Sequence, residues 1–238
     1  DVERVRQKLS GVIALEYVRM VDIPRPSKEV LAGFRTLGID ISCLVSDVLD
    51  GLGINGIIPT SVISPIMPEA IIVGPAITVR CEAERYNRTQ ASLNKIKANM
   101  GQGAGGAVCQ PGDIYVVDGK GLTSSLLGEL SALSAKKAGF LGAVLDGGVR
   151  DVQGILDGNF PVWARHTTPQ SGGLRVEAVE INGIITVGGV RVEPGDIIVA
   201  DRAGIAVVPV KQAEYVLKEC QAIVARDEQH KRERGLGR

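Results

Sequence analysis

The sequence predicts a single compact α/β domain, and three stretches of the chain support this prediction. Residues 113–117 and 141–145 are short apolar runs typical of buried strands, and a helical pattern separates them. Residues 71–80 are rich in β-branched side chains, and residues 176–210 alternate similar runs with turn-forming glycines. We therefore expect strands alternating with helices in one domain, with additional helices at both ends of the chain.

The composition fits an ordinary globular protein and argues against several functions. Of the 238 residues, 45% are apolar and 3% aromatic, and 27 acidic side chains balance 27 basic ones. Nucleic-acid binding needs a basic excess or stripe, so no nucleic-acid partner is expected. No apolar run approaches a membrane span and no signal peptide is visible, so no membrane partner is expected either. The four cysteines are widely spaced without a C-x-x-C motif, which favours a reduced, cytoplasmic location over zinc or disulfides.

The first 35 residues are expected to form a helical arm. Apolar side chains recur near helical spacing within residues 1–22, namely Val5, Leu9, Val12, Ile13 and Val18. Pro24 and Pro26 end this pattern because proline disrupts a helix interior. We expect this arm to pack on a neighbouring subunit.

A second helix is predicted over residues 40–53. Its apolar face consists of Ile41, Leu44, Val45, Val48, Leu49 and Leu52. Ser46 and Asp47 either face solvent or line a site, and the sequence favours neither. Farther along, residues 71–75 and 76–80 are predicted as two strands, broken at Gly74 and Pro75.

Residues 101–106 satisfy the G-x-G-x-x-G pattern of dinucleotide-binding proteins. That function requires a strand before the pattern and a helix after it. Residues 93–98 read instead as a polar helix, and a turn follows the glycines. We therefore predict a loop here and no dinucleotide site. A methyltransferase function is disfavoured for the same reason, since no cofactor site is visible.

The strand–helix–strand unit at residues 111–151 is the centre of the prediction. Residues 118–121 break the first strand, and the following helix ends at Gly139, as helices with a glycine cap do. Thr123, Ser124 and Ser125 are all possible caps at its start. Gly128 favours a later start, with a first turn of Gly128, Glu129, Leu130 and Ser131, and with Leu130 and Leu133 facing the core.

If the two strands pair in parallel, the helix is their crossover connection. The helix N-terminus and residues 147–151 then meet at the carboxyl edge of the sheet, where open α/β sheets bind ligands. Free amides at the helix start suit an anion, which Arg150 could also hold with two hydrogen bonds. Asp151 could hold a hard metal ion. The alternative is that Arg150 and Asp151 are an exposed ion pair that closes a turn.

The remaining elements follow the same alternation. Residues 152–156 are predicted as a short helix and residues 160–164 as a strand, with His166 at its carboxyl end in either a structural or a catalytic role. Arg165 and Arg175 are expected to be solvated rather than anion-binding. The turn and strand at residues 111–118 recur at residues 194–201. A last helix from Lys211 is expected to fray in the charged tail 226–238.

Several of these segments resemble the RraA-like family, which contains class II pyruvate aldolases and regulators of ribonuclease activity. The resemblance covers about residues 38–212 and rests on Gly128-Glu129-Leu130, residues 142–147, Val149-Arg150-Asp151, residues 160–165 and residues 194–209. The aldolase signature is an acid, twenty residues and then Arg-Asp, and Glu129 stands at that spacing, where the aldolase pattern has Asp. The resemblance implies a swivelling β/β/α domain over residues 36–212, with extra helices in residues 1–35 and 213–238.

The resemblance also implies a function. It is the divalent-metal-dependent retro-aldol cleavage of a 4-hydroxy-2-oxo acid, such as 4-hydroxy-4-methyl-2-oxoglutarate or 4-carboxy-4-hydroxy-2-oxoadipate, to pyruvate and a second oxo acid. Oxaloacetate decarboxylation is expected as an associated activity. Catalysis would use Arg150 and Glu129, the substrate would contact Gly128, Glu129, Leu130, Ser131 and Arg150, and Asp151 would ligate Mg²⁺ or Mn²⁺. The expected assembly is a homotrimer or a dimer of trimers. The alternative is a non-catalytic regulator of ribonuclease activity that acts by protein–protein binding.

Overall fold

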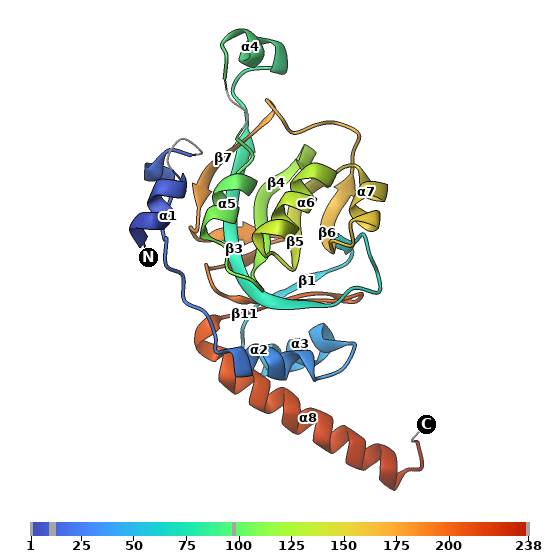
Figure 1. Ribbon diagram of the computed structural model, residues 1–238. Helices are drawn as coiled ribbons and strands as arrows, with labels where there is room; N and C mark the ends of the chain where they lie inside the picture. Colours follow the sequence, from blue (N-terminus) through green and yellow to red (C-terminus); the bar gives the residue numbers. More distant parts are fainter. Residues whose placement is uncertain (1, 10–12, 97–98, 237–238) are drawn as a thin grey trace.

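The computed structural model describes residues 2–9, 13–96 and 99–236. One strand, β3 (Ile72–Ala83), runs through two sheets that share it (Figure 1). Its first residues pair antiparallel with β10 (Ile197–Ala200), and its middle pairs parallel with β4 (Ile114–Leu127). The chain thereby builds two β layers around a single continuous strand.

The parallel sheet continues from β4 through β5 (Gly142–Val149) to β6 (Val162–Thr167). Antiparallel strands complete it at its edges: β2 (Ser64–Pro65) pairs with β6, and β7 (Val176–Ile181) pairs with the end of β3. The antiparallel sheet adds β11 (Gly204–Val208) and β1 (Ile57–Pro59) beyond β10, and β8 (Ile185–Val187) and β9 (Val190–Val192) form a separate hairpin.

Helices cover the outer faces of the two sheets. α5 (Gln102–Val108), α6 (Glu129–Ala138) and α7 (Val152–Asp157) lie on the parallel sheet (Figure 1). α2 (Lys28–Arg35), α3 (Ile41–Gly51) and α8 (Ala213–Glu233) pack against the antiparallel sheet. Three buried apolar clusters fill the gaps between these layers, one beneath each helical layer and one between the sheets. The predicted α/β domain, a β/β/α arrangement with added terminal helices, is confirmed.

The predicted break between residues 71–75 and 76–80 is wrong, because β3 is continuous. Gly74 allows close approach of the chain before β4: a Cβ at this position would lie 2.2 Å from the Gly112 carbonyl oxygen. Pro75 sits where β3 passes from its β10 partner to its β4 partner. A strand can lack an amide donor at such a crossing point without breaking a continuous ladder.

The helix in the N-terminal arm is shorter than the one predicted over residues 1–22. α1 (Val2–Leu9) ends before residues 10–12, and Val12 is among the residues that are not described. A single 3-10 turn, η1 (Leu15–Tyr17), follows, and Val18 then bridges to Ile181 of β7. Leu9 is fully buried in the cluster beneath the α5–α7 layer, so the arm packs on its own chain.

Three further predictions about local structure are corrected. The polar helix predicted at residues 93–98 is wrong for residues 94–96, because α4 (Arg88–Leu93) ends at Leu93 and Lys95 has a left-handed backbone; residues 97–98 lie outside the described residues. The predicted loop at residues 101–106 is largely helical, because α5 begins at Gln102. The charged tail does not fray at residue 226, since α8 continues to Glu233. None of the helices in the described ranges is both long and apolar enough to cross a membrane.

The two related turns at residues 111–114 and 194–197 each bury an aspartate. Asp113 receives two hydrogen bonds from the Arg25 guanidinium, 2.7 and 3.1 Å long, which tie the segment after η1 to the start of β4. Each aspartate accepts the amide three residues before it, Gln110 for Asp113 and Glu193 for Asp196, and Asp196 also accepts the Val210 amide. The two turns thus share one amide contact, to which an ion pair is added in the first and a second amide in the other.

Asp201, at the end of β10, joins three elements from a fully buried position. Its carboxylate accepts hydrogen bonds from the Ser42 amide (2.8 Å), the Ser42 hydroxyl (2.7 Å) and the Ala203 amide (2.9 Å). Its carbonyl accepts the indole N–H of Trp163 at 3.0 Å. Asp40, the residue before α3, makes no side-chain cap, so Asp201 caps α3 from a distant part of the sequence.

We expect Asp201→Ala to lower the free energy of unfolding by about 3 kcal/mol or more, because hydrogen bonds to a buried charge contribute roughly 1.5–3 kcal/mol each. Urea unfolding at fixed protein concentration measures the change. Asp50→Ala on the exposed side of α3 is the matched control and should change stability by less than about 0.5 kcal/mol. Equal effects of the two substitutions would contradict the capping role.

Candidate active site

A pocket of about 330 Å³ lies at the carboxyl ends of β4 and β5. The six residues predicted from the sequence all line it: Gly128, Glu129, Leu130, Ser131, Arg150 and Asp151. Met100, Ser125, Ser171 and Gly172 complete the lining. The pocket therefore lies at the sheet edge expected for a ligand site in an α/β fold.

Parallel pairing of β4 with β5 brings these residues together, as predicted. Leu127 pairs with Val149 at the end of both strands, and the Arg150 amide donates to the Leu127 carbonyl at 3.0 Å. The predicted end of the strand at residues 118–121 is wrong, because β4 bulges there and then resumes its pairing as far as Leu127. Thr123, Ser124 and Ser125 consequently belong to the strand and do not cap the helix.

α6 starts one residue after Gly128, its N-cap, and ends at Gly139, which is left-handed as predicted. The predicted orientation of its leucines is wrong. The side chains that α6 buries against the sheet are the small Ala132 and Ala135, whereas Leu130 is 79% exposed and Leu133 40% exposed. Leu130 thus stands at the mouth of the pocket rather than in the core.

Arg150 and Asp151 form a close, half-exposed pair. The Asp151 Oδ2 atom lies 3.3 Å from the Arg150 Nε atom and accepts the Glu129 amide at 3.4 Å. Asp151 adopts a left-handed backbone conformation, with φ of 55° and ψ of 43°. A non-glycine residue in this region is uncommon and costs conformational energy, which is typical of functional sites.

The first turn of α6 supplies free donors beside this pair. In any α-helix the first amides lack partners within the helix. The Leu130 and Ser131 amides make no hydrogen bond to the part of the chain that the structure describes. Together with the positive end of the helix dipole and the Arg150 guanidinium, they form a site suited to a carboxylate.

The sequence reasoning missed four residues of the lining, and each had only a weak signal. Ser125 drew attention only as a possible helix cap, and Met100 directly precedes the glycine-rich pattern. Ser171 and Gly172 belong to a polar stretch after β6. This stretch reaches the pocket because the Ser125 amide donates to the Gln170 carbonyl at 3.0 Å, a contact between distant segments.

Other candidate residues lie outside the pocket lining. His166 is in β6, with its Nε2 atom 3.4 Å from the Thr123 carbonyl oxygen. Arg165, expected to be solvated, forms an ion pair with the buried Asp146, and this contact raises the pKa of Arg165. Arg175 donates to the Ser171 carbonyl and is not among the residues that line the pocket. Ser46 and Asp47 do not line the pocket.

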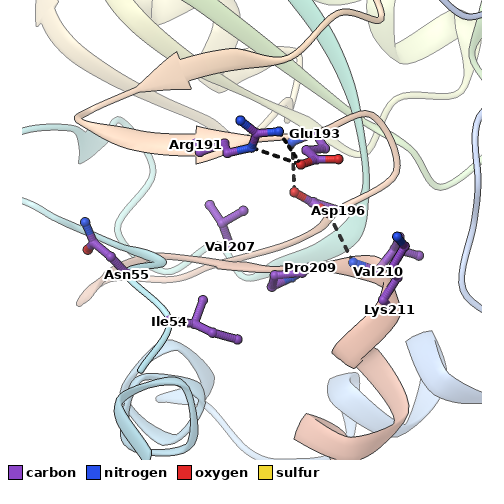
Figure 2. A pocket seen from close by; sticks show the side chains of 9 residues that line it. All are labelled: Ile54, Asn55, Arg191, Glu193, Asp196, Val207, Pro209, Val210 and Lys211. Carbon is purple, nitrogen blue, oxygen red and sulfur yellow. Dashed lines mark hydrogen bonds and ion pairs between the residues drawn. The ribbon is translucent and has the colours of Figure 1, made fainter. Parts of the chain in front are cut away.

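A pocket of about 250 Å³ beside the antiparallel sheet is a weaker candidate (Figure 2). Its buried acid, Asp196, already accepts the Glu193 and Val210 amides, and Arg191 is paired with Glu193 at 2.8 Å. Burial raises the pKa of Asp196, which disfavours its charged form as a ligand for a cation. Its buried acid is therefore engaged in holding the turn.

A larger pocket of about 530 Å³ opens at the amino ends of β3, β5 and β6. Its two cations, Arg35 and Lys136, donate to backbone carbonyl groups. This is the opposite edge of the sheet from the one where α/β folds bind ligands. The pocket with Arg150 and Asp151 is thus the best candidate site.

Comparisons with known proteins agree with the resemblance seen in the sequence. The RraA-like family model, described as Aldolase/RraA, matches residues 42–207. A Halalkalibacterium halodurans protein named "Putative 4-hydroxy-4-methyl-2-oxoglutarate aldolase" is 35% identical over 205 residues, covering 86% of this chain and 88% of that protein. An Ectopseudomonas mendocina protein of the same name is 38% identical over 139 residues, covering 57% of this chain and 75% of its own.

Solved structures share the fold. RraAS2 of Streptomyces coelicolor, described as an unusual member of the RNase ES inhibitor RraA protein family, superposes with a TM-score of 0.71 at 26% identity, covering 88% of this chain and all of that one. An uncharacterized protein from Pseudomonas syringae gives a TM-score of 0.73 at 24% identity, covering 90% of this chain and 96% of its own. The likeness to the Pseudomonas syringae protein concerns the fold alone.

We expect Gly128→Ala to weaken carboxylate binding in the pocket by at least about tenfold, or ~1.4 kcal/mol. A Cβ at residue 128 would lie 2.7 Å from Asp151 Oδ2 and 3.1 Å from Arg150 Nε, so the pair must move. Calorimetric titration with pyruvate and Mg²⁺ measures the change. Gly51→Ala is the control, since its Cβ would meet nothing within 4 Å. Unchanged affinity in the Gly128 variant would contradict this geometry.

Proposed function

The chain belongs to the RraA-like family, and we propose that it is a divalent-metal-dependent lyase that cleaves a 4-hydroxy-2-oxo acid to pyruvate and a second oxo compound. One observation carries the proposal: a single pocket joins the first amides of α6, Arg150 and Asp151. The names of the aldolase relatives support it. This reaction passes through a negatively charged pyruvate enolate, and each of the three features can bind the substrate or stabilise that charge.

Arg150 and the start of α6 suit the carboxylate and the 2-oxo end of the substrate. A guanidinium holds a carboxylate in a planar fork of two hydrogen bonds, and the free Leu130 and Ser131 amides can donate hydrogen bonds to the same group. As the C3–C4 bond breaks, negative charge develops on the 2-oxo oxygen. Donors already fixed in place stabilise that charge without reorganisation.

The carboxylates of the pocket fit Mg²⁺ or Mn²⁺. No group of three or more His, Cys, Asp or Glu side chains among the described residues could hold a metal ion, which disfavours a closed zinc site. Mg²⁺ commonly binds through one or two carboxylates and keeps several waters. Half-exposed Asp151 would be the direct ligand, with Glu129 nearby through a water. When bound, the ion would polarise the 2-oxo group as a Lewis acid.

Glu129 is the residue of the pocket suited to move a proton. Retro-aldol cleavage removes the proton of the 4-hydroxyl group, turns C4 into a carbonyl carbon and leaves an electron pair on C3, which is then protonated to give pyruvate. Arg150 cannot accept a proton because its guanidinium is already protonated, and Asp151 is the proposed metal ligand. The Glu129 side chain rests on α7, where a Cβ at Gly154 would lie 2.5 Å from its Oε2 atom.

Oxaloacetate decarboxylation is proposed as an associated activity. Loss of carbon dioxide from C3 of oxaloacetate leaves the same pyruvate enolate, so the same donors stabilise it. We also propose a homotrimer or a dimer of trimers, on family grounds, and a cytoplasmic location, on the ground of the four widely spaced free cysteines. The exposed Leu130 and Leu133 near the pocket give a neighbouring subunit an apolar surface to cover.

The alternative is a docking protein that regulates a ribonuclease. The likeness to RraAS2 supports it, and Leu130 and Leu133 could equally contact such a partner. A docking protein needs charge and shape at the surface, but not the fork geometry of a guanidinium. The two functions therefore respond differently to a substitution that keeps the charge of Arg150.

We expect Asp151→Asn to reduce metal-dependent pyruvate release from 4-hydroxy-2-oxo acids by at least about 100-fold, because the metal loses its charged ligand. The fold should persist, since asparagine tolerates a left-handed backbone. Steady-state assays with Mg²⁺ or Mn²⁺, and with a chelator, measure the change. Asp157→Asn on the exposed side of α7 is the control. Undiminished turnover in the Asp151 variant would remove the metal assignment.

We expect Arg150→Lys to lower kcat/KM for oxaloacetate or a 4-hydroxy-2-oxo acid by more than about tenfold, corresponding to ~1.4 kcal/mol of transition-state stabilisation. The melting temperature should barely change, because the side chain is half exposed. Arg202→Lys is the control, because Arg202 forms an exposed ion pair with Glu69 on the surface. If the unmodified protein releases no pyruvate with either metal, the enzyme proposal fails and the docking function takes its place.

A further inference from the structure

Two helices begin beside the pocket, and each contributes an acid to it. α6 begins with Glu129, and α7 begins directly after Asp151, its N-cap; both acids line the pocket. The two helices lie next to each other on the parallel sheet (Figure 1). The Glu129 amide donates to Asp151 Oδ2 at 3.4 Å, which fixes the backbone of Glu129. The position of its carboxylate then depends on what the side chain meets on α7.

Gly154 of α7 leaves the space that the Glu129 side chain occupies. An added Cβ at residue 154 would lie 2.4 Å from Glu129 Cδ, 2.5 Å from Oε2 and 2.7 Å from Cγ. Non-bonded carbon atoms pack best at about 3.5–4.0 Å, so a larger residue at 154 would displace the carboxylate. The arrangement recurs one helical turn later, where a Cβ at Gly158 would lie 2.9 Å from Leu133 Cδ2.

The backbone of α7 gives no other reason for glycine at residue 154. Gly154 lies within the helix, does not have a positive φ, and accepts the Gly158 amide at 2.9 Å as a regular helical residue does. Glycine inside a helix is less favourable than alanine. Alanine would therefore suit the helix better, and the feature that requires glycine here is the Glu129 side chain.

Building on the proposed function, we infer that Gly154 is a positioning residue for the retro-aldol step, because it holds the Glu129 carboxylate where that group can take the proton of the 4-hydroxyl. In this step the O–H bond breaks, C4 becomes a carbonyl carbon, and the electron pair of the C3–C4 bond passes into the pyruvate enolate. Oxaloacetate has no such proton to remove. Its C3–C4 bond breaks as carbon dioxide leaves, and water protonates the enolate at C3. Displacing Glu129 should therefore slow cleavage and spare decarboxylation.

The test measures pyruvate release by Gly154→Ala at saturating Mg²⁺, from oxaloacetate and from whichever of 4-hydroxy-4-methyl-2-oxoglutarate and 4-carboxy-4-hydroxy-2-oxoadipate is cleaved faster. The kcat for cleavage should fall at least about tenfold, because a misplaced general base loses much of its effect. The KM for cleavage, the kcat for decarboxylation and the calorimetric affinity for pyruvate should each stay within about twofold, since Arg150 and Asp151 keep their places. The melting temperature should not fall, because alanine favours the helix.

Two further variants make the test specific to Glu129. Gly106→Ala adds the same methyl group inside α5, where its Cβ would meet Ala138 Cβ at an ordinary 3.4 Å, and should leave both reactions unchanged. Glu129→Ala removes the side chain that Gly154 accommodates. Adding Gly154→Ala to Glu129→Ala should therefore slow the residual cleavage by less than about twofold.

The outcomes separate the inference from the function on which it rests. Undiminished cleavage by Gly154→Ala, or an equal loss of cleavage and decarboxylation, overturns the inference and leaves the lyase in place. Cleavage by the double variant that is about tenfold slower than by Glu129→Ala also overturns it, because the two residues would then act independently. If the unmodified protein cleaves neither 4-hydroxy-2-oxo acid, the proposed cleavage and the inference fail together.

Discussion

The hydrogen bond from the Arg150 amide to the Leu127 carbonyl fixes the geometry on which the candidate site depends. It extends the parallel pairing of β4 and β5 one residue past Val149, and so sets where β4 ends relative to Arg150. β4 uses ten residues from Asp118 to Leu127 where β5 uses four from Asp146 to Val149. The extra residues leave the sheet as a bulge, and the site forms only because β4 returns to its partner.

Buried carboxylates hold this bulge at the point where it departs. Asp118 and Asp146 lie side by side in register, and each accepts an amide of the β8–β9 hairpin, Thr186 at 3.4 Å and Gly188 at 2.8 Å. Burial raises the pKa of Asp118, and the neighbouring charge of Asp146 adds to the effect. Arg165 compensates part of this charge through its ion pair with Asp146. The hairpin between the two sheets thus supports a site at the sheet edge, although it contributes none of the residues that line the pocket.

The sequence predicted the parts of this arrangement that depend on local chemistry. Gly139 ends α6 because only a left-handed residue completes that cap, and the parallel pairing follows from the length of the crossover. The sequence could not show that β4 resumes its pairing after the bulge, because residues 118–121 have the composition of a strand end. Pairing with β5 keeps the strand going despite that composition. The rest of the pocket lining could not be predicted either, since Met100, Ser125 and Gly172 come together only through contacts between distant segments.

The misjudged face of α6 shows how packing controls the position of the site. Amphipathic reasoning places leucines against the sheet, yet α6 buries Ala132 and Ala135 there. Small side chains let a helix lie close to the strands beneath it, and this brings the first amides of α6 within reach of Asp151. Leucines on that face would hold the helix farther from the sheet and separate the amides from the carboxylate. The exposed leucines of α6 are therefore a consequence of the same requirement that assembles the pocket.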